Sequence, residues 1–216
     1  RGQQLDMADF PERAVREALA SAFVHRLLGS LSPVAVEHSA ELLVIESRGP
    51  LVNGVSLSNI LTTQSRPRNP ALAKAFRNLG PIEELGTGVP RMYREMVRSG
   101  KQPPSISAGP NSVRVALSGG FGNKSLARFI VGLPSDEAND TDTLLTSLHL
   151  CDNATVNSED LAGILQRPSS EAARILERLA SPPTDIVEPT RESIRYRDPN
   201  YRFRSEVLEQ LGTVVR

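Results

Sequence analysis

The segment PERAVREALASAFVHRLL, residues 11–28, sets the first element of the fold. Its apolar side chains recur at helical spacing, and Pro11 suits a first helical turn. Two short β-like runs follow at 34–37 and 42–46, separated by a polar turn near Ser39. A helix followed by a pair of strands predicts a layer of helix against a sheet.

The pattern continues in the same way through the first half of the chain. Helical spacing or helix-ending glycines predict helices near 57–61, 71–79 and 87–99, and residues 112–117 alternate as a strand does. Helices interleaved with strand pairs are typical of an α+β layer structure. We therefore expect an α+β domain over residues 1–118.

The second half has a different pattern of short helices followed by extended runs. Residues 119–139 contain glycines and prolines around a short apolar helix, and we expect them to form a connector. A winged helix-turn-helix consists of three helices followed by a pair of strands, and we expect this fold over residues 140–216. The expected helices are 143–151, 158–166 and 169–179, and the expected strands are 186–188 and 194–197.

Composition excludes several classes of protein. Lys and Arg number 25, as do Asp and Glu, so the chain is not a strongly basic nucleic-acid binder. Aromatic residues are 4% and Trp is absent, which disfavours a base-stacking platform for single strands. The single cysteine, Cys151, excludes an internal disulfide framework, and the three scattered histidines form no metal-binding motif. We expect no metal site and no membrane span, and a cytoplasmic location.

The winged helix would offer polar residues to duplex DNA. Its third helix would enter the major groove, and its wing would contact phosphates or the minor groove. Residues 140–216 hold nine Arg against thirteen Asp or Glu, a net charge of −4, whereas 186–204 hold five against three, a net of +2. The candidate DNA contacts are Ser169, Ser170, Glu171, Arg174 and Arg178 on the helix and Arg191 and Arg195 on the wing.

The negative net charge of residues 140–216 also allows a second interpretation. A net-acidic domain neutralises few phosphates and binds DNA weakly unless its arginines cluster. The same fold would then serve for dimerisation or for contact with a protein partner. A homodimer is the expected state of a DNA-binding form, because half-sites are usually duplicated.

Three stretches of the first half carry a resemblance to a known family. They are Arg16–Arg26 (REALASAFVHR), Ser65–Pro70 (SRPRNP) and Leu79–Arg91 (LGPIEELGTGVPR). They resemble proteins described as RecG-related ATP-dependent DNA helicases or as transcriptional regulators. Proteins of that family join an AlbA-like (Schlafen-type) domain, a middle domain and a C-terminal helix-turn-helix. The resemblance implies a GHKL-like (histidine-kinase ATPase-like) α/β sandwich here, with the N-terminal AlbA-like domain absent from this sequence.

The resemblance also implies a nucleotide site on the first helix. In GHKL folds a Glu activates water and an Asn one turn later helps to hold Mg²⁺; here Glu17 is in the first position and Ser21 in the second. The Asp-x-Gly-x-Gly loop that reads adenine has no counterpart at 46–50. The candidate nucleotide-binding residues are Ser21, His25, Gly86, Thr87 and Gly88, with ATP and Mg²⁺ as the possible cofactors and Glu17 as the catalytic base of an ATPase.

Each of these candidates also has a structural interpretation. The glycines at 86 and 88 suit a tight turn that starts a helix, and Glu17 and His25 suit a solvated carboxylate and a partly buried histidine. Arg66 and Arg68 suit either a loop held by carbonyl groups or a phosphate contact. The glycine-rich run 119–125 lacks the spacing of a P-loop.

The sequence thus leaves three hypotheses for function. The first is a DNA-binding transcriptional regulator in which the GHKL-like domain is a scaffold or sensor. The second is a nucleotide-binding protein or ATPase, and the third is a non-enzymatic dimerisation or interaction module. Because the ATPase motifs are incomplete and helicase motor motifs are missing from the sequence, we expect a binding protein rather than an enzyme.

Overall fold

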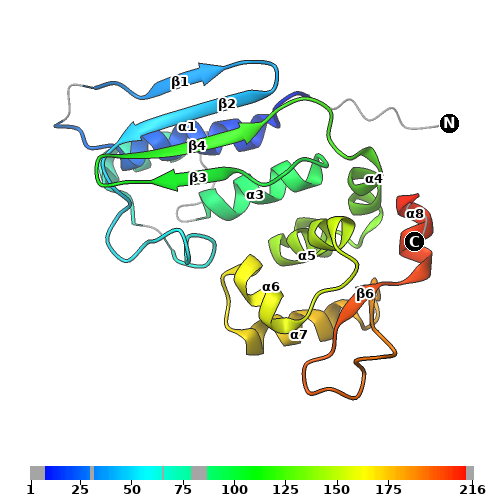
Figure 1. The fold of residues 1–216 in the computed structure, drawn as a ribbon. Helices are drawn as coiled ribbons and strands as arrows, with labels where there is room; N and C mark the ends of the chain where they lie inside the picture. The colour runs from blue at the N-terminus through cyan, green and yellow to red at the C-terminus, as the bar shows by residue number, and fades with distance from the viewer. Residues whose placement is uncertain (1–7, 30–31, 65, 79–86, 213–216) are drawn as a thin grey trace. The chain divides into compact units, whose positions relative to one another are not determined.

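The computed structural model divides the chain into two compact units, Arg1–Gly122 and Asn123–Arg216 (Figure 1). It describes residues 8–29, 32–64, 66–78 and 87–212. The segment expected to be a connector is divided between the units. Residues 119–122 belong to the first unit, and the rest of the segment contributes a helix to the second.

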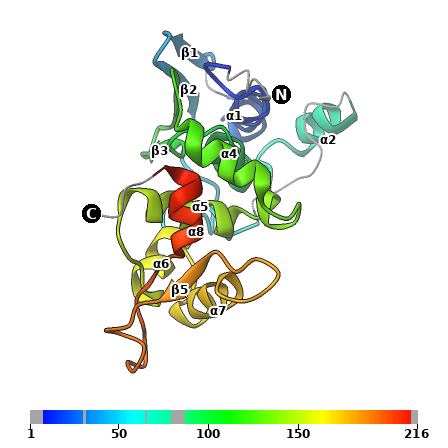
Figure 2. The ribbon, with the colours of Figure 1, turned by 90° about the vertical axis from the view of Figure 1, so that its right-hand side faces the viewer.

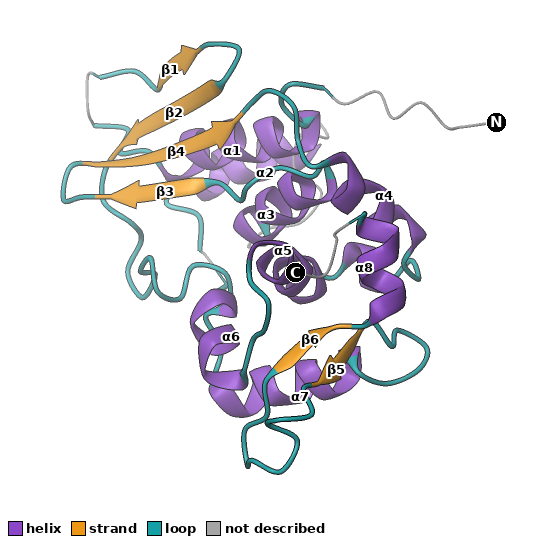
Figure 3. Ribbon diagram, turned by 45° about the vertical axis from the view of Figure 1, so that its right-hand side comes forward, coloured by secondary structure: helices purple, strands orange, loops and turns teal. Residues whose placement is uncertain are grey.

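The first unit contains a four-stranded antiparallel sheet with the order β1-β2-β4-β3 (Figure 3). The strands are β1 (Ala35–His38), β2 (Leu42–Arg48), β3 (Ser105–Ala108) and β4 (Ser112–Ser118). In the register of the two central strands, Ile45 lies opposite Val115. The strands expected near 34–37, 42–46 and 112–117 are confirmed, whereas the sequence pattern did not predict β3.

Helices α1 (Glu12–His25) and α3 (Gly88–Arg98) cover one face of this sheet, and α2 (Pro70–Asn78) packs against α1. Each helix is close to its expected range. Alanines at 14, 18 and 22 form a small-residue face on α1, which packs against α3 and the sheet. The buried core of this layer comprises Ala14, Ala18, Ala22, Leu43, Ile45, Met92, Met96, Val115 and Leu117. The expected α+β class is therefore confirmed.

The short helix expected at 57–61 is not formed. Residues 53–62 make successive turns instead. The side chain of Asn59 accepts a hydrogen bond from the Ser56 amide (2.7 Å) and donates one to the Gly54 carbonyl (3.0 Å). Such side-chain bonds to the backbone compete with a helix, which five residues are too few to sustain.

The second unit is built mainly of helices. They are α4 (Lys124–Gly132), the 3₁₀ turn η1 (Glu137–Asn139), α5 (Thr141–Asp152), α6 (Ser158–Leu165), α7 (Ser169–Leu179) and α8 (Ser205–Leu211). The three helices expected after residue 140 are confirmed. Helices α4 and α8 lie side by side although they are far apart in the sequence (Figure 2). Leu161, Leu165, Leu176 and Leu179 are fully buried where α6 and α7 pack together.

A two-stranded sheet completes this unit, and its second strand differs from the expected one. Strand β5 (Val187–Pro189) pairs with β6 (Tyr201–Phe203), not with residues 194–197. Residues 190–200 form a loop held by Ser193, whose hydroxyl accepts a hydrogen bond from the Asn200 amide (2.8 Å) and bonds the Thr190 hydroxyl (2.6 Å). The alternation of Ile194 and Tyr196 resembled a strand, but both side chains are exposed.

Candidate ligand pocket in the N-terminal unit

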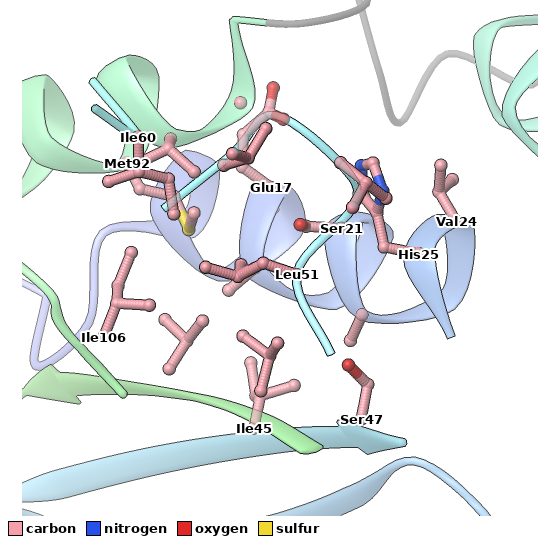
Figure 4. Close-up of a pocket in the computed structure, with 18 of the residues that line it drawn as sticks. Glu17, Ser21, Val24, His25, Ile45, Ser47, Leu51, Ile60, Met92 and Ile106 are labelled. Atoms are coloured by element: carbon pink, nitrogen blue, oxygen red, sulfur yellow. The ribbon is translucent and has the colours of Figure 1, made fainter. Parts of the chain in front are cut away.

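A pocket lies in the first unit between helices α1 and α3, the sheet and the segment 49–63 (Figure 4). Its volume is about 110 Å³, several times the roughly 10–15 Å³ that one water molecule needs. Most of its wall is apolar, with polar groups at a few points, as is typical of small-molecule sites. Residues from four parts of the fold contribute to it, among them Glu17, Ser21, His25, Ile45, Ser47, Leu51, Ile60, Gly88 and Met92.

One end of the pocket holds a buried ion pair. Nη1 of Arg91 lies 2.7 Å from Oε1 of Glu17, and the two side chains are 12% and 6% exposed. Gly88 begins α3 beside the same carboxylate, since a Cβ built on it would lie 3.1 Å from Oε2 of Glu17. Glu17 thus links α1 to α3. The ion pair occupies an oxygen of this carboxylate, which is unfavourable for accepting a proton from a water molecule.

Ser21 and His25 lie one and two turns further along α1 and also line the pocket (Figure 4). Burial, and to a smaller extent the nearby Arg68, lower the pKa of His25 below its ordinary value. The imidazole is therefore neutral at pH 7 and can both donate and accept a hydrogen bond.

The residues expected to bind nucleotide are partly brought together. Ser21, His25 and Gly88 line the pocket, and Thr87 directly precedes Gly88. Gly86 lies outside the described residues. Their roles in binding stay predictions.

Ser47, which the sequence motifs did not reveal, lies on β2 at the other end of the pocket. The residue is 7% exposed, and its hydroxyl points toward the pocket (Figure 4). The described residues provide no hydrogen-bond partner for this hydroxyl. A signal was present: Leu43, Ile45 and Ser47 alternate along the strand, so the serine occupies an inward position in an otherwise apolar series.

The segment around Arg68 and Asn69 holds the C-terminal end of α1. Nε of Arg68 donates to the His25 carbonyl and its Nη2 to the Pro50 carbonyl, both at 2.8 Å. Asn69 donates from its backbone nitrogen to the Val24 carbonyl (3.0 Å) and from its side-chain Nδ2 to the Arg26 carbonyl (2.9 Å). The donors to the Val24, His25 and Arg26 carbonyls satisfy groups that a helix end leaves unpaired. For Arg68, the interpretation as a loop clamp is supported over a phosphate contact.

The glycine-rich run 119–125 has a packing role. A Cβ on Gly119 would lie 2.3 Å from the Ala40 carbonyl oxygen, and one on Gly122 would lie 2.5 Å from that of Ser99. The buried Lys101 donates from Nζ to the Gly120 carbonyl. Burial lowers the pKa of Lys101, an effect that Asp9 opposes. The glycines allow close backbone contacts, which agrees with the rejection of a P-loop.

The candidate DNA-binding residues lie in the second unit. Ser169, Ser170 and Arg174 are exposed on α7, and Arg191 and Arg195 are exposed on the loop between β5 and β6. These positions are compatible with contact to a partner. Their roles in DNA binding stay predictions.

Arg178 on the same helix is engaged within the unit. Its guanidinium donates to both carboxylate oxygens of Glu137 and to Asp140, the latter at 2.6 Å. Thr143 and Thr184 donate to the same Glu137 carboxylate. Burial alone would raise the pKa of Glu137, but these hydrogen bonds outweigh it and hold the pKa below its usual value. Arg178 therefore fixes α7 to η1 and α5.

The surface beside α7 is rich in carboxylates. A shallow groove there is lined by Asp136, Glu137, Asp140, Asp142, Arg167, Glu171, Arg174, Ile175 and Arg178. Arg167 pairs with Asp142 (2.9 Å) and Glu171 (3.2 Å), so part of the positive charge is already neutralised. Burial raises the pKa of Asp142, and Arg167 partly offsets this. The groove is a poor site for phosphate, because like charges repel.

The part of the chain that the structure describes contains no group of three or more His, Cys, Asp or Glu side chains placed to hold a metal ion. None of the helices described there has the length and apolar character to cross a membrane. Burial raises the pKa of the Cys151 thiol to about 11, and Asp152 adds to this, so the thiol is a weak nucleophile at neutral pH.

Comparison with known proteins gives one family and one structure. Residues 32–117 match the family model described as "Putative ATP-dependent DNA helicase recG C-terminal". The crystal structure of the DIP2311 protein from Corynebacterium diphtheriae superimposes with a TM-score of 0.79 at 26% sequence identity. That alignment covers 96% of this chain and 42% of the solved chain. No curated protein matches.

The family match covers the sheet but not the first helix. The family match begins after α1 and ends within β4, so it covers Ser47 and Gly88 but not Glu17, Ser21 or His25. The chain spans about two fifths of the length of the solved protein. The first unit is thus an ATPase-like α+β domain similar to the RecG C-terminal family.

Proposed function

We propose that the first unit binds an adenine nucleoside or nucleotide, and that its pocket holds the base and sugar of that ligand. The observation that carries this proposal is the pocket, on which Glu17, Ser21, His25 and Gly88 converge. Its apolar wall suits a planar base, and the buried hydroxyl of Ser47 suits a hydrogen bond to the base edge. The match to an ATP-dependent family supports the choice of adenine.

We propose further that this domain binds without efficient hydrolysis. A general base must reach the attacking water, and the Glu17 carboxylate is paired with Arg91. The described pocket adds hydroxyl groups such as that of Ser21 but no second carboxylate, so its donors do not fit Mg²⁺. The nucleotide would then act as a signal or a structural ligand.

Isothermal titration calorimetry with adenosine, ADP and ATP, each with and without Mg²⁺, tests the proposal. We expect binding that Mg²⁺ does not strengthen. The Ser47→Ala variant should bind with roughly two- to tenfold lower affinity, because it loses one hydrogen bond of about 0.5–1.5 kcal/mol. Ser105→Ala is the control, because Ser105 is exposed on β3 and does not line the pocket. Absence of binding for all three ligands at millimolar concentration contradicts the proposal.

A second candidate function belongs to the second unit, which we propose is a winged helix that contacts duplex DNA as a homodimer. The supporting observation is the element order, three helices followed by the β5–β6 pair, with an isolated bridge between Val156 and Tyr201 as a third strand position. The loop 190–200 exposes Arg191, Arg195 and Arg197. Because carboxylates line the groove beside α7, this loop is the better candidate for contact with phosphates.

Fluorescence anisotropy with labelled duplex DNA over a salt series tests this second function. We expect affinity to fall with salt, and the double variant Arg191→Ala/Arg195→Ala to reduce both the affinity and the salt slope. The control is Arg202→Ala on β6, whose guanidinium pairs with Glu188 (2.9 Å). If no binding occurs at low salt, the unit is better explained as an interaction module, and light scattering measures whether it forms a dimer.

A further inference from the structure

The N-terminal end of α3 is a place where negative charge is favoured. The first amides of a helix have no partners within the helix, and the helix dipole puts partial positive charge there. Helix α3 has eleven residues and no acidic residue in its first turn. Arg91, one turn into the helix, adds a full positive charge on the side facing α1.

Glu17 supplies the negative charge from another element. Its Oε1 contacts Nη1 of Arg91 at 2.7 Å, and its Oε2 lies 3.1 Å from the position of a Cβ on Gly88, the first residue of α3. The carboxylate thus occupies the position that a phosphate takes when a helix N-terminus and an arginine bind one. Glu17 also lines the pocket (Figure 4).

We propose that Glu17 is a specificity-determining residue that makes the pocket favour an uncharged nucleoside over its phosphorylated forms. This inference rests on the proposed function, in which the pocket holds the base and sugar of an adenine ligand. A phosphate group entering at α3 would have to displace the Glu17 carboxylate from Arg91 or lie against it. Displacement leaves a side chain that is 6% exposed without its cation, and contact places like charges together, so both are unfavourable.

The polar groups at the other end of the pocket are suited to an uncharged ligand. Ser47 is nine-tenths buried and has a hydroxyl, and His25 is neutral because burial lowers its pKa. Both can hydrogen-bond an uncharged ligand without the cost of burying a charge. In the wild-type protein we therefore expect adenosine to bind more tightly than AMP, and AMP more tightly than ADP.

The variant Glu17→Gln tests the role of the charge, because it keeps the shape of the side chain and an oxygen that can accept from Arg91. We expect this variant to bind AMP and ADP at least tenfold more tightly than the wild type, and adenosine within about threefold of it. Glu12→Gln is the matched control. Glu12 is a carboxylate of the same helix that pairs with Arg16 at the surface and does not line the pocket.

A further variant separates charge from packing. In the double variant Glu17→Gln/Arg91→Gln the increase in ADP affinity expected for Glu17→Gln should disappear, while adenosine binding should persist. Circular dichroism of each variant before titration establishes that it is folded. If Glu17→Gln does not fold, the order of affinities in the wild type decides, and tighter binding of ADP than of adenosine overturns the inference.

The outcomes for this inference and for the proposed function are distinct. If adenosine binds but Glu17→Gln leaves ADP affinity unchanged or weaker, Glu17 does not select against phosphate, and the nucleoside site stands. If neither adenosine nor its phosphorylated forms bind to the wild type, the proposed function itself fails.

Discussion

Each unit of this protein contains a buried carboxylate held by an arginine, and the surroundings of the two differ. In the second unit Glu137 accepts from three side chains of that unit, Arg178, Thr143 and Thr184, beside a shallow groove. In the first unit Glu17 pairs with Arg91 at the edge of a pocket.

The difference supports different roles for the two carboxylates. A buried carboxylate surrounded by donors of its own unit has little capacity left for a ligand. A buried ion pair at a mostly apolar pocket can exchange partners with a ligand that enters the pocket. These surroundings indicate a structural role for Glu137 and are compatible with the ligand-related role that we propose for Glu17.

The largest expected effect is on the second unit. Replacing Arg178 by alanine leaves the Glu137 carboxylate, 8% exposed, without its cation. We expect a loss of about 2 kcal/mol in the free energy of unfolding, below the roughly 3–5 kcal/mol for a fully buried pair, because the Arg178 side chain is 41% exposed.

Urea denaturation followed by circular dichroism measures this loss. The exposed Arg174 on the same helix provides the control, and Arg174→Ala should change stability by less than about 0.5 kcal/mol. Equal effects of the two variants would contradict the structural role of Arg178.

The next effect concerns the end of α1 beside the pocket. Asn69→Ala removes side-chain donors to the Arg26 and Phe23 carbonyls, at 2.9 and 3.4 Å. We expect a loss of about 1 kcal/mol in stability, since one of these bonds is long. A weaker affinity for adenosine should accompany it, because His25 lies at this end of the helix. The exposed Arg66 is the control, and a similar loss in Arg66→Ala would contradict a specific role for Asn69.

A smaller effect is expected from pH. Burial lowers the pKa of His25 in the folded state below 6.5, the value in the unfolded chain, so the unfolded chain binds the proton more readily. The stability should therefore fall as the pH drops below about 6.5, until it passes the folded pKa. Urea denaturation at pH 7.5 and 5.5 measures this, and His25→Gln should reduce the difference. If His25→Gln shows the same difference in stability between the two pH values as the wild type, other groups cause that difference.

The smallest expected effect on stability is that of Ser47→Ala. Because its hydroxyl has no hydrogen-bond partner among the described residues, its removal should change the free energy of unfolding by less than about 0.5 kcal/mol. Thermal denaturation measures the stability, and the affinity for adenosine is measured on the same sample. A large loss of stability would place Ser47 among the structural residues and weaken the comparison.

Much of the fold could be predicted from local patterns. Apolar spacing predicted α1, α3 and α7 nearly to their ends, because such spacing is what a half-buried helix requires. Strand β3 was missed because its four residues follow two prolines and give too short a pattern. The strand expected at 194–197 was wrong, because an alternation of exposed residues in a loop resembles one.

The candidate site could be predicted in part. Glu17, Ser21, His25 and Gly88 were found by their motifs and line one pocket. Ser47 was not found, because only the packing of the sheet against α1 places its hydroxyl at a cavity.

The sequence by itself determined most of the helices, three strands of the first sheet and the motifs that resemble a helicase-related family. Only the tertiary structure decided which charges meet. Arg91 is 74 residues from Glu17 along the chain, and Arg178 is 41 residues from Glu137. Periodicity records how each segment is buried, whereas ion pairing depends on which segments pack together. The physical role of each arginine therefore emerged only from the folded chain.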